Sequence, residues 1–162
     1  MVPKLCGLLE SGADVNAQDK DLASPLHLAS SRASSDIMWS GVALVLLDNG
    51  AEVNAVNIHG QNSLHILVLH TSDAFNLGEG LARLLLDRGV NLNGRDKDEI
   101  TPLHVTLRRL LPDMAQFLLE NGADVNTKNS RGKYPLQFAS GRKRKEMKRL
   151  LLEYSSEHDT VT

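Results

Sequence analysis

Three histidines recur in register, and imidazole is the side chain best suited to acid–base chemistry or metal binding near neutral pH. They end the segments Ser24-Pro25-Leu26-His27, Asn62-Ser63-Leu64-His65 and Thr101-Pro102-Leu103-His104, with Tyr134-Pro135-Leu136-Gln137 as a fourth version. His65 and His70 miss the i, i+4 spacing that would place two metal ligands on one helix face. A histidine that recurs with its neighbours indicates a repeated structural unit rather than a reaction centre.

The other residues that could do chemistry do not form a catalytic pattern. The glycines follow leucine-rich stretches instead of forming a phosphate-binding loop, and no motif marks a serine nucleophile. Cys6 lies among leucines, where a thiol is expected to be inert. We therefore expect no enzymatic activity, with no catalytic, cofactor-binding or metal-binding residues.

The elements that position these histidines belong to a repeat. Four segments align at Gly12, Gly50, Gly89 and Gly122, which are spaced by 38, 39 and 33 residues. In each segment an apolar residue and an Asn stand three and four positions after the glycine. Leucines precede every glycine, and the Pro-Leu-His element or its variant follows about a dozen residues later. The chain is therefore built from internal repeats.

Each repeat has the start and stop signals of a helix pair. Thr101 is a good N-cap, and Pro102 suits the first helical position, where its missing N–H costs nothing. Each glycine can take the left-handed conformation that ends a helix. The polar stretch between them favours an extended turn. One unit is then a turn, a helix A, a loop and a helix B.

On these residues the chain resembles the ankyrin repeat family, whose period is about 33 residues. The resemblance implies an all-α solenoid of stacked helix–turn–helix units with short extended β-turn fingers. It implies a domain over residues 1–154, divided into a partial repeat 1–12 and repeats 13–50, 51–89, 90–122 and 123–154, before a polar tail at 155–162. It also implies that His27, His65 and His104 are structural, joining the turn threonine and backbone of neighbouring repeats.

Composition limits the environment and the partners. The net charge of −2 does not indicate nucleic acid or membrane binding, and the single cysteine favours a reducing compartment. We expect a cytoplasmic protein. Nuclear localisation stays open because Arg142-Lys143-Arg144-Lys145 resembles an import cluster, although it also suits a polar cap. The chain is expected to be a monomer or part of a longer array, with a protein as its partner.

Three departures from the pattern stand out. The first two full repeats carry longer loops between their helices, and these loops contain Trp39 and Phe75. The two aromatics either pack the loops together or anchor a partner. Leu110 replaces a loop glycine at a conformational cost, and the fourth repeat has Tyr134 and Gln137 where the cap threonine and the histidine should stand.

The resemblance also implies a binding face made of turn tips and the exposed side of helix A. The residues of this expected face change from apolar to strongly basic along the chain: Val56, Ile58, His59, Arg95, Lys97, Ile100, Arg108, Arg109, Lys128, Arg131 and Lys133. The basic part suits an acidic or phosphorylated segment of a partner. The alternative is a solvated surface in which arginines merely offset a helix C-terminus.

Two expectations complete the interpretation. Ankyrin proteins similar to this one can be hydroxylated on a turn asparagine that follows a leucine by eight residues, and Asn16, Asn54 and Asn126 fit that pattern. The function implied is a non-catalytic scaffold for protein–protein interaction. The alternative is a substrate-recruiting or regulatory segment of a larger multidomain protein, such as a ubiquitin ligase adaptor.

Overall fold

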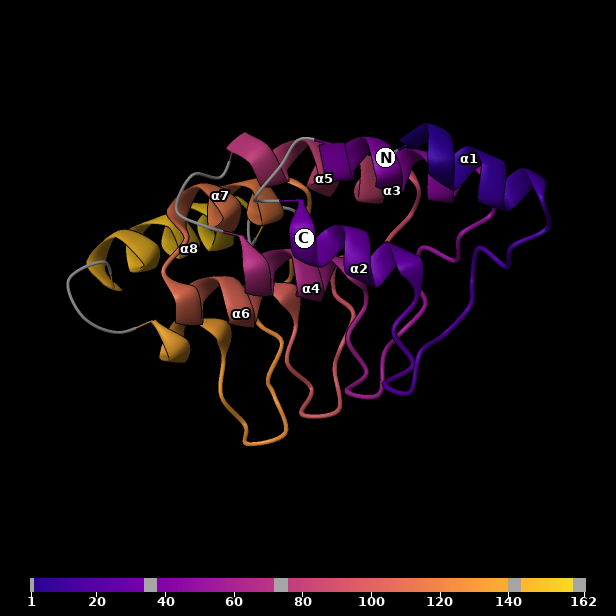
Figure 1. Ribbon diagram of the computed structural model, residues 1–162. Helices are drawn as coiled ribbons and strands as arrows, with labels where there is room; N and C mark the ends of the chain where they lie inside the picture. Colours follow the sequence, from indigo (N-terminus) through magenta and orange to yellow (C-terminus); the bar gives the residue numbers. More distant parts are fainter. Residues whose placement is uncertain (1, 34–37, 72–75, 140–143, 159–162) are drawn as a thin grey trace. The chain divides into compact units, whose positions relative to one another are not determined.

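The computed structural model describes residues 2–33, 38–71, 76–139 and 144–158, and these residues form helices and turns without strands (Figure 1). Their helices are α1 (Val2–Glu10), α2 (Pro25–Arg32), α3 (Met38–Asp48), α4 (Ser63–His70), α5 (Asn76–Asp87), α6 (Pro102–Arg109), α7 (Pro112–Glu120), the 3₁₀ helix η1 (Pro135–Phe138) and α8 (Arg144–His158). The chain divides into two compact units, Met1–Asn91 and Leu92–Thr162. The repeat boundaries expected from the sequence stay predictions.

In the first unit, helices pack as two rows. In one row α2 lies against α4. In the other row α3 contacts both α1 and α5, and α2 packs on α3 between the rows (Figure 1). Leucines fill the space between rows and are fully buried: Leu26, Leu46, Leu64, Leu67, Leu81 and Leu85. Aliphatic packing forms this core, as the low aromatic content of 4% requires.

The second unit uses the same packing with shorter elements. α6 lies against η1 and α7, and α7 lies against α8. The core side chains from α6, α7 and α8 are again aliphatic or thioether: Leu103, Leu107, Met114, Leu118 and Met147. Buried side chains from all three helices therefore build the core of the second unit.

The segments that connect one helix pair to the next are here called fingers: finger 1 (13–24), finger 2 (51–62), finger 3 (90–101) and finger 4 (123–134). Each glycine before a finger has a positive φ, with values of 87°, 88°, 81° and 92° at Gly12, Gly50, Gly89 and Gly122. The expected left-handed helix ends are therefore confirmed. Leu110 also adopts a left-handed conformation, with φ of 58°, although it carries a side chain.

Helix A of the fourth repeat differs from the expected helix. It is only η1, a single 3₁₀ turn, where α2, α4 and α6 each have 8 residues. Tyr134 replaces the cap hydroxyl, and its ring faces Lys128, whose Nζ lies 5.0 Å from the ring centroid. Gln137 accepts the Tyr134 backbone N–H at 2.8 Å, so one cap bond of the motif survives.

The long loops are only partly described. Phe75, the second of the two aromatics expected in these loops, lies outside the described residues. Residues 34–37 and 72–74 lie outside them as well. Trp39 is half-buried on α3, with the Arg32 guanidinium carbon 6.0 Å from its ring centroid. Whether the two aromatics pack together or bind a partner stays a prediction.

Two glycines allow a matched test, because Gly80 lies inside α5 and Gly89 lies just after its end. Gly89→Ala is expected to destabilise the chain by about 1–2 kcal/mol, because an L side chain resists a positive φ. Gly80→Ala, inside α5, is expected to raise the free energy of unfolding of the chain by roughly 0.5–1 kcal/mol, because alanine favours a helix interior over glycine. A Cβ at either position meets no atom within 4 Å, so only backbone conformation should act. Urea denaturation measures both, and a neutral Gly89→Ala would contradict the argument.

Candidate functional site

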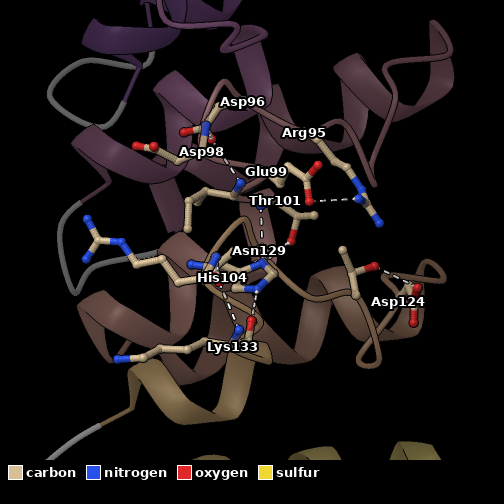
Figure 2. Close-up of polar contacts among 12 residues, drawn as sticks. Arg95, Asp96, Asp98, Glu99, Thr101, His104, Asp124, Asn129 and Lys133 are labelled. Carbon is tan, nitrogen blue, oxygen red and sulfur yellow. Dashed lines mark hydrogen bonds and ion pairs between the residues drawn. The ribbon is translucent and has the colours of Figure 1, made fainter.

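His104 joins α6 to the finger that follows it. Its Nδ1 accepts the Thr101 backbone N–H at 3.2 Å and lies 2.9 Å from the Thr101 hydroxyl oxygen. Its Nε2 lies 3.2 Å from the Lys133 carbonyl oxygen, so Nε2 carries the proton and donates (Figure 2). One neutral ring therefore satisfies backbone groups on fingers 3 and 4.

His27 makes the same bridge in the first unit. Its Nδ1 accepts the Ser24 backbone N–H at 3.2 Å, and its Nε2 donates to the Gln61 carbonyl at 2.9 Å. His65 is fully buried and pairs with Asn62, its own N-cap residue, at 2.7 Å. The bridge between neighbouring repeats expected of the motif histidines therefore matches the contacts of His27 and His104, whereas the hydrogen bonds described for His65 cap its own helix.

Burial sets the charge of the bridging rings. Desolvation lowers the pKa of His104 below 6.5, although the hydrogen bond to the Lys133 carbonyl and the charge of Asp96 oppose it. Desolvation likewise lowers the pKa of His27, against the Gln61 carbonyl and Asp19. Both rings are thus held neutral, which suits an Nδ1 that must accept a hydrogen bond.

Asparagines join consecutive fingers. The Asn16 side chain donates to the Gly50 carbonyl at 3.0 Å and accepts the Glu52 N–H at 2.8 Å. Asn54 repeats this with the Gly89 carbonyl at 2.9 Å and with the N–H of Asn91. In the second unit, Asn93 joins finger 3 to finger 4 through the Gly122 carbonyl at 3.3 Å and the Asp124 N–H at 2.9 Å.

Asn126 occupies the same place in the last finger but has a different environment. Among the described residues its side-chain amide has no hydrogen-bond partner, and only its backbone N–H is engaged, by Asp124 at 2.7 Å. Hydroxylation of Asn16, Asn54 and Asn126 stays a prediction. The first two amides are occupied at both atoms, whereas that of Asn126 is available.

The finger carboxylates shape their own turns. Asp96 Oδ1 accepts the backbone N–H groups of Asp98 and Ile100, both at 2.9 Å (Figure 2). Asp19 holds finger 1 in the same way. Neighbouring tips are then tied by backbone bonds, Ile58 N–H to the Asp21 carbonyl at 2.8 Å and Ser130 N–H to the Asp98 carbonyl at 3.0 Å. Asp19 and Asp96 therefore hold fingers 1 and 3 in shape, and Asn57 and Asn129 accept the equivalent bonds in fingers 2 and 4.

A cleft of about 160 Å³ in the second unit gathers part of the expected binding face. The cations Arg108, Arg131 and Lys133 line it together with the carboxylate of Asp98. None of these three cations forms an ion pair with the described part of the chain. The cleft is therefore lined by cations whose charge is not neutralised by ion pairing within those residues.

The remaining basic residues of the expected face lie outside the cleft lining. Lys97, Arg109 and Lys128 are exposed. Arg95 is exposed and pairs with Glu99 at 3.4 Å, an ion pair of small energetic value at a surface. Ile100 differs from the exposed apolar tip expected of it, because it is only 8% exposed and forms part of the cleft wall.

The expected face is more apolar in the first unit. Val56 and Ile58 are 48% and 40% exposed, and His59 is exposed beside them. Sequence reasoning missed two further exposed leucines, Leu22 at 45% and Leu28 at 53%. A signal was present at Leu22, because the aligned positions in fingers 2 and 4 are the glycines Gly60 and Gly132.

Other kinds of site find no support in the described parts of the chain. There, no three His, Cys, Asp or Glu side chains are grouped so that they could hold a metal ion. Over the same residues, none of the helices has the length and apolar character needed to cross a bilayer.

Comparison with known families decides the identity. A family description of ankyrin repeats in many copies matches residues 82–139, and a second, of a single ankyrin repeat, matches residues 21–58. The chain belongs to the ankyrin repeat family. The all-α ankyrin fold expected from the sequence is thereby confirmed. Ankyrin repeat domains are generally non-catalytic modules for protein–protein interaction.

The ankyrin chain is similar to short parts of much longer proteins. It is 37% identical to the neurogenic locus Notch protein of Drosophila melanogaster over 67% of this chain and 4% of the relative. Identity is 34% to human transient receptor potential cation channel subfamily A member 1, over 63% and 9%, and 35% to human Rabankyrin-5, over 62% and 9%. The chain thus spans less than a tenth of each relative.

We expect the neutral bridging rings of this ankyrin chain to make its stability depend on pH. Unfolded histidines bind protons near pH 6.5, whereas folded His27 and His104 bind them only at lower pH. Their stabilisation is therefore complete above pH 6.5 and is lost as the pH falls, at up to about 1.4 kcal/mol per pH unit for each ring. The double variant His27→Gln/His104→Gln should flatten this dependence in urea titrations at several pH values. An unchanged slope would refute it.

The finger asparagines allow a second comparison. Asn54→Ala removes two hydrogen bonds between fingers and is expected to lower the free energy of unfolding by about 1 kcal/mol. Asn126→Ala is the matched control and should change it by less than about 0.5 kcal/mol, because that amide holds no other finger. Denaturation of both variants measures this, and equal losses would contradict the role given to the asparagines.

Proposed function

We propose that this ankyrin chain binds a partner protein through the basic finger surface of its second unit, and that the partner presents an acidic or phosphorylated segment. The observation that carries this proposal is the cleft lined by Arg108, Arg131 and Lys133. The other exposed basic residues of the expected face, Arg95, Lys97, Arg109 and Lys128, would surround the bound segment.

Guanidinium groups suit such a segment. Arg108 and Arg131 can each offer two parallel N–H donors to a carboxylate or phosphate, whereas the Lys133 ammonium acts as a point charge. Asp98 lies in the same cleft and opposes anions, so the lining holds three cations against one carboxylate. Exposed charges of this kind raise the association rate and select partners more than they add affinity.

The fixed finger backbone supports the same proposal. Arg131 and Lys133 donate their backbone N–H groups to Asn129 Oδ1 at 3.0 and 2.9 Å, and the Lys133 carbonyl is held by His104. Two of the three cleft cations therefore project from a finger that is already ordered. A preordered surface loses less conformational entropy on binding.

A second proposal is that the chain serves as a regulatory or substrate-recruiting segment of a larger protein. It is favoured by the small share, 4–9%, of the relatives that the chain matches. Under both proposals the chain binds a partner protein.

Charge reversal tests the basic surface. Arg108→Glu/Arg131→Glu is expected to weaken binding of a fluorescent 12-residue peptide of Glu and one phosphoserine by at least about tenfold, roughly 1.4 kcal/mol, because two contacts become repulsive. Fluorescence anisotropy measures Kd at low and high salt, and the salt dependence should fall as well. A serine version of the peptide separates phosphate recognition from general acidity.

The control for this test makes the same charge change elsewhere. Lys145→Glu/Lys148→Glu reverses two exposed lysines of α8, neither of which lines the cleft. It should leave the Kd within about twofold, a difference of roughly 0.4 kcal/mol. Equal effects of the two double variants would show that only net charge matters and would overturn the proposed site.

A further inference from the structure

We propose that the finger tips of the first unit form a second binding surface, centred on Leu22, which takes an apolar partner segment that carries basic residues. This surface lies on different fingers from the basic cleft, and it does not depend on the function proposed for that cleft.

Leu22 stands in a conformation that a leucine avoids. Its φ is +57°, in the left-handed region that favours glycine, and the aligned residues Gly60 and Gly132 have φ of +77° and +70°. Two of the four fingers thus use glycine at this position, and finger 1 does not. A residue kept in a sparsely populated conformation points to a role beyond folding.

Burial does not offset the strain at Leu22. Its side chain is 45% exposed, so folding recovers only part of the benefit of removing it from water. Glu99 shares the strained conformation, with φ of +58°. Its carboxylate is well hydrated when exposed and pairs with Arg95, so it needs no partner protein. Leu22 is therefore the strained finger residue whose side chain would gain from contact with a partner.

Other exposed apolar groups lie close to Leu22. The hydrogen bond from Ile58 N–H to the Asp21 carbonyl sets Ile58 beside the residue that precedes Leu22. Both Ile58 and Val56 are at least 40% exposed. At the base of the same finger, a cavity of about 540 Å³ is lined by Leu28, Ile66 and Pro25, among others. The finger tips and this cavity together offer a partner several apolar contacts.

Charge selects the kind of segment that fits. Fingers 1 and 2 carry the carboxylates of Asp14, Asp19, Asp21 and Glu52 against a single lysine, Lys20. Asp19 lines the cavity, and Asp21 is exposed with no ion pair to the described residues. An apolar segment with lysine or arginine residues complements this surface, whereas an acidic segment is repelled.

Two synthetic probes test the surface. They are 15-residue fluorescent peptides with the same leucine positions, one with lysine and the other with glutamate at every remaining position. The lysine peptide should shift the NMR amide signals of fingers 1 and 2, with a Kd from those signals at least tenfold lower than the glutamate peptide gives at the same amides. The glutamate peptide is expected to shift fingers 3 and 4, where the basic cleft lies. Equal shifts of fingers 1 and 2 by both peptides, or lysine-peptide shifts confined to fingers 3 and 4, would overturn the proposal.

A matched pair of variants separates binding from strain. Leu22→Gly should raise the melting temperature by about 2–4 °C and weaken the lysine peptide at least fivefold, because strain and contact are lost together. Glu99→Gly should raise it similarly and leave that Kd unchanged. The proposal fails if Leu22→Gly binds as well as the original chain. It also fails if sedimentation shows self-association that Leu22→Gly abolishes, because a second copy would then cover the surface.

Discussion

Each finger exposes more backbone hydrogen-bonding groups than it can satisfy alone, and this constraint shapes every unit of the chain. A bridging histidine accepts from the start of its own helix and donates to a carbonyl of the following finger, as at His27 and His104. An asparagine then meets a carbonyl and an N–H near the start of the following finger. The rings must stay neutral to do this, so their burial and tautomer are part of the same constraint.

The repeating features could be predicted from the sequence because they depend on local chemistry. Thr101 before Pro102 predicts a helix start, and Gly122 predicts a left-handed helix end, in any context. The conformations at Leu22 and in η1 could not be predicted in this way. At Leu22 the rest of finger 1 imposes a turn that glycine would prefer. At η1 the Pro-Leu pattern of a helix start is present, but the helix stops after a single 3₁₀ turn.

The residues of the proposed binding face could be predicted as a set, but the cleft that some of them share could not. The resemblance to ankyrin repeats placed Arg108, Arg131 and Lys133 at finger and helix positions expected to face a partner, yet only the structure shows that they share one cleft. It also shows that Ile100 turns into the wall, because side-chain burial depends on packing that no repeat pattern specifies. The two units thus carry surfaces of different chemistry, one apolar and acidic and the other basic.

The single-turn helix η1 has a consequence for how the basic cleft would respond to a ligand. Phe138 of η1 lines the cleft, and Arg131 and Lys133 lie in the finger just before it. So short a helix contains few hydrogen bonds, so it can open locally at a low free-energy cost. Such opening would displace Phe138 and disrupt the cleft. Under the proposed function, anion binding and local order would be thermodynamically linked. An anion bound to these side chains would slow amide exchange in finger 4, and opening of η1 would release the anion.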